Sequence, residues 1–135
     1  MRTALLGSSP LRASRLSYGC MRISYGEKGD PSADVIRRGI EAVMAAHEAG
    51  YVLFDTADIY GKAASETILG AALREHASLR REILIATKCG IRQTGDPTPR
   101  DVPRYDFSKE HILRSCEGSL TRLGIETIDL YESAE

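Results

Sequence analysis

Short apolar runs alternate with helical patterns along this chain, and this alternation constrains the fold more than any other feature. The run at 51–55, which ends in a carboxylate, and the run at 83–87 are apolar without the polar alternation of a half-exposed strand, and a further strand is expected to begin at 128–131. Strands of this kind are typical of parallel sheets that are buried on both faces. Amphipathic helical spacing fills the intervals between them. We therefore predict an α/β fold with a parallel sheet and the order β-α-β-α-β-α-β.

Capping residues mark the three helices that this order requires. Ser32 precedes the first helical pattern as an N-cap and Gly50 follows it as a stop. A second helix is expected to start at Ser65-Glu66, which we interpret as a cap and its support. The third is expected to run from Ser108 to Gly124. These boundaries place connections of about 30–40 residues between strands, as βαβ units require.

The N-terminal region predicts the first strand of the sheet and a smaller element before it. Two apolar stretches, Ala4–Leu6 and Leu16–Ile23, are separated by turn residues at 7–10. We expect a short N-terminal strand or hairpin, followed by a strand on which Leu16, Tyr18 and Cys20 share one face.

Composition limits the binding partners and the cellular compartment that can be expected for this chain. The net charge is −1, so no excess of positive charge is available for nucleic acid. No apolar run approaches the ~20 residues of a membrane span, and the N-terminus lacks the apolar core of a secretory signal. Three widely spaced cysteines form no CxxC pair, and we expect no metal site. These features predict a cytoplasmic protein without a membrane partner.

Three residues at strand ends and in one loop suggest chemistry. Asp55 and Lys88 each end a predicted strand, and Tyr60 follows Asp55 in the next connection. If these strands are parallel neighbours, all three side chains lie at one rim. A lysine ammonium beside a phenol favours the phenolate, and a carboxylate keeps the lysine charged and oriented. Such a tyrosine can give a proton to a carbonyl oxygen while a cofactor supplies the hydride. Spacing alone favours a loop-capping aspartate, a packed tyrosine and a solvated lysine over a catalytic group.

The sequence around these residues closely resembles the aldo-keto reductase family over almost the whole chain. The family pattern FDTAxxYG, followed by SExxLGxAL, matches residues 54–61 and then Ser65-Glu66 and Leu69-Gly70. Three further segments resemble the first, third and fourth barrel strands of the family: LSYGCM at 16–21, the run 83–88 that ends in lysine, and the run 123–131.

The resemblance implies the N-terminal half of a (β/α)8 TIM barrel and the reduction of aldehydes or ketones with NADPH. It implies that Tyr60 is the proton donor, that Lys88 activates it, and that Asp55 holds Lys88 in place. It also implies a small-molecule carbonyl substrate. The residues that it places beside the cofactor are Gly19, Cys20, Met21 and Asp55.

The chain departs from the family pattern in two respects. The family motif DLYxxH places a histidine five residues after Asp129, where this chain has Ala134. The chain's own histidines, His47, His76 and His111, fall on predicted helices and are expected to be surface or interface residues. A complete barrel takes ~250 residues. We therefore expect residues 1–135 to form a partial reductase domain that lacks the C-terminal half, through a frameshift, a premature stop or a deliberate truncation.

These departures leave several functions open. The chain is expected to be a reductase by family, and its 135 residues alone are expected to be inactive. The alternatives are a truncated non-catalytic remnant, a regulatory binding subunit and, least supported, a metal-dependent hydrolase. Unpaired barrel edges predict self-association. The long connection 89–107 is expected to contribute to the substrate pocket, with Tyr105 and Phe107 as an apolar wall. The choice of carbonyl substrate, and of NADPH over NADH, is not fixed by this part of the sequence.

Overall fold

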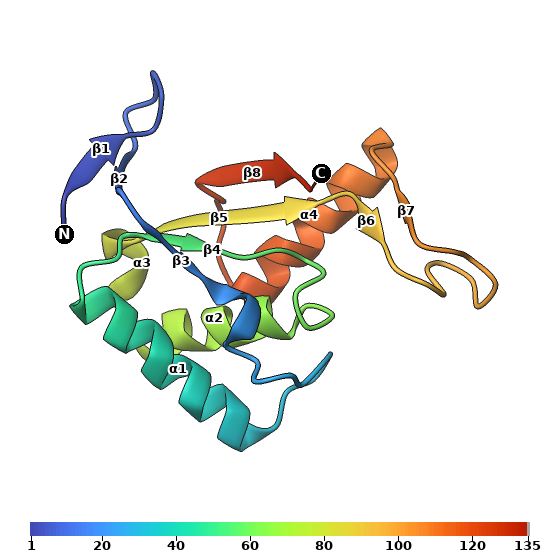
Figure 1. The fold of residues 1–135 in the computed structure, drawn as a ribbon, viewed down its shortest axis with the longest axis horizontal. Helices are drawn as coiled ribbons and strands as arrows, with labels where there is room; N and C mark the ends of the chain where they lie inside the picture. The colour runs from blue at the N-terminus through green and yellow to red at the C-terminus, as the bar shows by residue number, and fades with distance from the viewer. Residues whose placement is uncertain (135) are drawn as a thin grey trace.

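A four-stranded parallel sheet forms the centre of the molecule (Figure 1). The computed structural model describes residues 1–134. The strands lie in the order β3-β4-β5-β8, and their bounds are Ser17–Gly19, Leu53–Asp55, Leu84–Cys89 and Leu130–Ser133. Each strand of this sheet pairs in parallel with its neighbour in that order. The predicted α/β fold, the N-terminal half of a (β/α)8 barrel, is confirmed.

Helices connect the strands and cover one face of the sheet. They are α1 (Ala33–Glu48), α2 (Ala64–Glu75), α3 (Leu79–Glu82) and α4 (Lys109–Leu123). The core lies between helices and sheet, where Phe54 and Ile85 meet Val43, Ile68 and Leu123 at 0% exposure. The expected N-cap Ser32 and the expected helix start at Ser108 are confirmed, because the side chains of both serines accept hydrogen bonds from backbone N–H groups, of Val35 and His111 respectively. The four-residue α3 was not expected, because so short a helix has no periodicity to detect.

A β-hairpin precedes the sheet, as predicted. It pairs β1 (Thr3–Leu5) with β2 (Arg12–Ser14) in antiparallel orientation. Ser14 fixes the hairpin to the main sheet, because its Oγ accepts hydrogen bonds from the backbone N–H groups of Val52 (2.9 Å) and Leu53 (3.2 Å). The hairpin therefore lies at the N-terminal end of β4, away from the end that carries Asp55.

Two local predictions are wrong. The first strand ends at Gly19, and the chain turns into the 3-10 helix η1 (Cys20–Arg22), closed by a hydrogen bond from Ile23 N to Cys20 O. Cys20 therefore does not continue a strand face with Leu16 and Tyr18. Helix α2 begins at Ala64 after Ala63, which has a φ of 71° and makes no side-chain cap. Ser65 lies inside the first turn, fully buried, and is not an N-cap.

The connection after β5 contains a two-stranded ribbon. It consists of β6 (Ile91–Arg92) and β7 (Arg104–Tyr105), paired in antiparallel orientation. The sequence predicted a long connection here without secondary structure. Figure 1 shows the ribbon extending beyond the carboxyl end of β5. Within residues 1–134, no helix is long and apolar enough to cross a membrane.

Candidate active site at the carboxyl rim of the sheet

Asp55 and Lys88 form an ion pair at the carboxyl ends of neighbouring strands. Asp55 lies opposite Ala86 in the β4–β5 register, so Lys88 is two residues further along β5 on the same face. Lys88 Nζ lies 2.5 Å from Asp55 Oδ1 and donates a second hydrogen bond to the carbonyl oxygen of Thr56 at 2.7 Å. The two side chains are only 17% and 30% exposed. The lysine is therefore held in one orientation at the rim.

Tyr60 lies beside this ion pair. Lys88 Nζ is 5.2 Å from the centroid of the Tyr60 ring. The loop that carries the tyrosine is attached to β5 by two backbone hydrogen bonds, from Thr56 N to Ala86 O (2.8 Å) and from Asp58 N to Lys88 O (3.1 Å). The structure thus brings together the three residues that the sequence grouped.

A left-handed turn directly follows Tyr60. Gly61, Lys62 and Ala63 have φ values of 59°, 50° and 71°. Positive φ is unfavourable for residues with a Cβ, by roughly 1–3 kcal/mol each, and persists only where the surroundings enforce it. A Cβ on Gly61 would lie 3.0 Å from both the carbonyl oxygen of Glu27 and Ser24 Oγ. The loop after β3 therefore packs directly against the Tyr60 loop and fixes its shape.

The segment expected to contact a cofactor is divided between surface and core. Gly19 is exposed and pairs with Asp55 across the sheet. Met21 is 60% exposed. Cys20 is fully buried, and burial raises the pKa of its thiol to about 12, with Asp55 adding to the rise and Lys88 opposing it. Its side chain therefore packs as a neutral thiol in the core, near the Asp55–Lys88 pair.

Ala134 also lies at this rim. Its backbone N–H donates a hydrogen bond to the carbonyl oxygen of Cys89 at 2.8 Å. The residue that stands in place of the histidine of the DLYxxH pattern is therefore next to the end of β5, one residue beyond Lys88. Its methyl group brings no proton donor to the rim.

A buried carboxylate, which the sequence marked only as support for a helix, links three elements below the rim. Glu66 on α2 is 0% exposed. Its two oxygens accept hydrogen bonds from Thr87 Oγ1 on β5 (2.6 Å) and from Arg122 Nε on α4 (2.7 Å). A buried charge requires this kind of pairing. Its contacts indicate a structural role. The motif SExxLG gives no sign of its partners, which lie 21 and 56 residues away.

Asp58 is a second partly buried acid that the sequence did not single out. Burial raises the pKa of its carboxyl to about 6, and the nearby Glu66 adds to the rise. Arg122, the Ser115 hydroxyl and the backbone N–H of Ile59 face the carboxylate and oppose the shift. The loop between Asp55 and Tyr60 thus contains a group that titrates near neutral pH.

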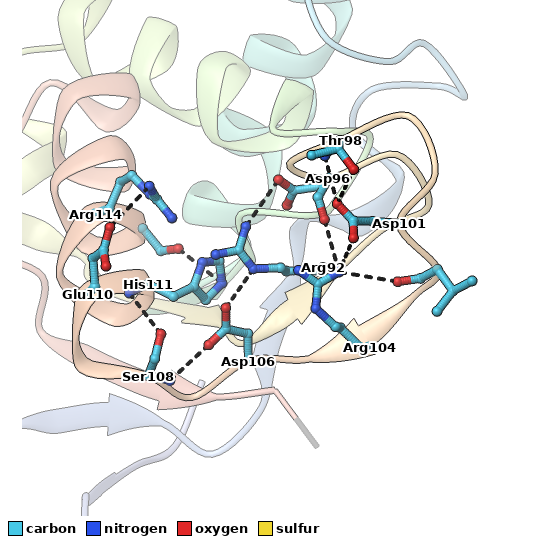
Figure 2. Close-up of polar contacts among 12 residues, drawn as sticks. Arg92, Asp96, Thr98, Asp101, Arg104, Asp106, Ser108, Glu110, His111 and Arg114 are labelled. Atoms are coloured by element: carbon cyan, nitrogen blue, oxygen red, sulfur yellow. Dashed lines mark hydrogen bonds and ion pairs between the residues drawn. The ribbon is translucent and has the colours of Figure 1, made fainter.

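Charged side chains hold the ribbon in place (Figure 2). Arg92 is buried and donates through Nε to Asp106 (2.6 Å) and through Nη1 to Asp96 (3.2 Å). Asp106 also accepts from the backbone N–H of Ser108 at the start of α4, at 2.9 Å. These contacts attach the ribbon to α4.

Beneath the ribbon lies His111, which is 7% exposed. Burial lowers its pKa, and the nearby Arg92 lowers it further. The expectation that His111 is a surface or interface residue is therefore wrong, because the ribbon covers this part of α4. His47 and His76 are partly exposed.

Two aromatic side chains project from the ribbon. Tyr105 and Phe107 stack with their centroids 5.8 Å apart and are 61% and 45% exposed. Phe107 packs on Gly90, where any Cβ would overlap its ring. The pair is thus fixed two residues beyond Lys88. Among residues 1–134, no group of three His, Cys, Asp or Glu side chains is placed to hold a metal ion.

Comparisons with known proteins agree with this geometry. The model of the Aldo/keto reductase family matches residues 15–135. A probable aldo-keto reductase 1 from Glycine max is 38% identical over 93% of this chain, and a 6-dehydroglucose reductase from Agrobacterium fabrum is 40% identical over 91%. The chain spans only 34% and 40% of the length of these relatives.

Solved structures show the same partial overlap. An aldo-keto reductase AKR11C1 from Bacillus halodurans superposes with a TM-score of 0.78 at 31% identity, over 98% of this chain and 40% of that protein. The glycerol dehydrogenase AKR11B4 from Gluconobacter oxydans gives a TM-score of 0.80 at 30% identity, over 97% and 38%. The rim geometry, the family match and these structures together show that the chain belongs to the aldo-keto reductase family.

Proposed function

We propose that residues 1–135 are a partial reductase domain that supplies the proton-donor side of an NADPH-dependent aldo-keto reductase. The reaction is the reduction of an aldehyde or ketone to an alcohol. The observation that carries this proposal is the cluster at the rim: Lys88 Nζ lies 2.5 Å from Asp55 and 5.2 Å from the Tyr60 ring centroid. In this proposal the cluster is the catalytic group.

Each residue of the cluster has a distinct role. The Tyr60 hydroxyl donates a proton to the carbonyl oxygen of the substrate as that oxygen gains negative charge. The Lys88 ammonium stabilises the phenolate that remains. Asp55 and the carbonyl oxygen of Thr56 hold the ammonium in place. NADPH, when bound, supplies the hydride that reaches the carbonyl carbon.

The residues of this chain fit one end of the cofactor. Gly19 and Met21 are exposed at the rim beside Asp55, and the Cys20 backbone joins them. The described residues contain no glycine-rich phosphate cradle of the GxGxxG kind. We therefore assign the nicotinamide end to this segment and the phosphate contacts to a part of the enzyme outside these residues.

Two relatives support a small-molecule substrate. The free cysteines support a reducing compartment. The relatives include a 6-dehydroglucose reductase and a glycerol dehydrogenase. Cys20, Cys89 and Cys116 are free thiols, which favours a reducing compartment such as the cytoplasm.

A second candidate is a chain that binds without turnover. It is favoured by Ala134, which leaves the rim without the histidine of the DLYxxH pattern. Ala134→His separates the two candidates. In a working site this variant raises the rate of carbonyl reduction, whereas in a non-catalytic chain it changes nothing.

The proposed function is tested by NADPH titration and by NADPH oxidation with a panel of aldehydes and ketones. If the parent chain binds NADPH and turns over, we expect Tyr60→Phe to lower the rate at least ~100-fold, as loss of a general acid does, without changing the Kd of NADPH. Tyr51→Phe is the matched control, because Tyr51 packs against Tyr18 in the core. Turnover retained in Tyr60→Phe contradicts the assignment. A parent chain with neither cofactor binding nor turnover favours the non-catalytic candidate.

A further inference from the structure

A cavity of about 600 Å³ or more lies on each side of the Tyr60 loop, and the two differ in their charges. One lies under the ribbon, where Arg92 is paired with Asp106 and Arg122 with Glu66. Lys62, Arg114, Asp58 and Asp96 also line it, so its lining carries charges of both signs. The other, of about 650 Å³, lies between residues 21–28 and Gly61.

The second cavity shares a wall with the Tyr60 loop. Gly61, the residue after Tyr60, lines it and accepts a hydrogen bond from the backbone N–H of Gly29 at 2.8 Å. The close approach of Glu27 O and Ser24 Oγ to Gly61 fixes this wall. A ligand in the cavity is therefore next to the loop that carries the proposed proton donor.

The cavity carries positive charge without a matching negative one. Arg22 and Lys28 line it, and neither forms an ion pair within residues 1–134. Glu27 is the one acid among the lining residues. Its carboxylate is directed to the start of α1, where it accepts from Ser32 N (2.5 Å) and Ser32 Oγ (2.8 Å). The two cations thus remain available to an anion.

The cavity also has an apolar wall. Met21 is 60% and Tyr25 is 48% exposed, although both are large and apolar. The Tyr25 ring is held in place by the Arg38 guanidinium, which lies 4.0 Å from its centroid. This third cation adds to the positive charge. Apolar surface beside free cations is suited to a short apolar body that ends in an anionic group.

We infer that this cavity binds the carboxylate end of an acidic carbonyl substrate, with Arg22 and Lys28 as the cationic contacts and Met21 and Tyr25 against the substrate body. This inference rests on the proposed function, because it places the carbonyl end of the substrate at Tyr60. Aldehyde or keto acids are then preferred over neutral carbonyl compounds of the same shape.

Methionine NMR provides a direct test that needs no turnover. The chain has three methionines, Met1, Met21 and Met44, so 13C-methyl labelling gives one probe in the cavity and two references outside it. The chain is titrated with 4-carboxybenzaldehyde and with its neutral analogue, methyl 4-formylbenzoate. We expect the Met21 signal to shift with a Kd about tenfold lower for the acid, which corresponds to ~1.4 kcal/mol.

Charge variants complete the experiment. Lys28→Gln and Arg22→Gln are each expected to weaken binding of the acid about fivefold to tenfold and to leave the ester unchanged. Lys109→Gln, at the exposed start of α4, is the matched control and leaves both affinities unchanged. Equal affinities for acid and ester, or no shift at Met21 with either compound, overturn the inference.

Failure of this inference is distinguishable from failure of the proposed function. Reduction of the ester at the same kcat/KM as the acid, with loss of both in Tyr60→Phe, keeps the function and removes the acid preference. Selective binding of the acid without reduction of either compound keeps the cavity assignment and removes the function.

Discussion

The titration of Asp58 makes the stability of the folded chain depend on pH. Its carboxyl has a pKa of about 6 in the folded chain against 3.8 for an ordinary aspartate, mainly through burial. Between these values the folded chain binds more protons than the unfolded chain, so stability falls as the pH rises from about 4 to about 6 and stays lower above it. Asp58→Asn removes this penalty. We predict that the variant is more stable at pH 7 by roughly 1 kcal/mol, allowing for solvent screening of a partly exposed group, and matches the parent at pH 4.

Urea midpoints measured from pH 4 to pH 7.5 check this prediction. The comparison is made between variant and parent at each pH, so the titration of other acids, such as the hydrogen-bonded Asp106, cancels. A difference that is the same at pH 4 and pH 7 contradicts the assignment of a raised pKa to Asp58.

Glu66 provides a test of how much a single buried charge contributes to the free energy of unfolding. Glu66→Gln keeps the shape of the side chain but removes the counter-charge of Arg122 and alters the hydrogen bond with Thr87. We predict a loss of about 2 kcal/mol in the free energy of unfolding, below the full cost of a broken buried pair because Arg122 is 29% exposed. Glu41→Gln, which breaks an exposed pair with Arg37, should cost less than about 0.5 kcal/mol. Urea unfolding at pH 7 measures both, and equal losses would falsify the role of burial.

At the scale of elements, glycine sets how closely α2 and α4 approach. A Cβ on Gly70 would overlap the backbone carbonyl of Arg122 and lie 3.0 Å from the Cα of Leu123. Backbone cannot move aside, so we predict that Gly70→Ala costs about 2 kcal/mol, despite the better helix propensity of alanine. Gly118→Ala on α4 is the control. Its Cβ meets the side-chain end of Arg122 rather than backbone, so a smaller loss than for Gly70→Ala is expected. Thermal unfolding of the two variants, followed by circular dichroism, tests the difference.

Elements with strong local patterns were predictable, and those set by distant contacts were not. Ser32 and Ser108 cap helices because the signal for capping lies within four residues of sequence. Asp55 and Lys88 meet because strand ends in a parallel sheet share an edge. The turn at Ala63, by contrast, depends on packing against the loop after β3. The burial of His111 depends on a ribbon held by Arg92 and Asp106. Neither the packing nor the ribbon produces a periodic pattern in the sequence.

At the scale of the whole molecule, the sheet has one covered face. Phe54 and Ile85 are fully buried under the helices, whereas Leu53, Leu84 and Leu130 are only half-buried. The register places these three leucines on the opposite face, since Leu53 pairs with Leu84 and Ala86 pairs with Leu130. Parallel strands are normally covered on both faces. In the described residues, β3 and β8 each also have an unpaired edge.

We therefore predict that a polypeptide of these 135 residues associates through this uncovered face. Sedimentation velocity at rising protein concentration should show an increasing average mass, because each association removes apolar surface from water. Leu84→Asn places an amide on the uncovered face and should lower the extent of association. Leu113→Asn, on the exposed side of α4 at 52% exposure, is the control and should leave it unchanged. A chain that stays monomeric at every concentration, or the same effect from both variants, would show that the uncovered face does not drive association.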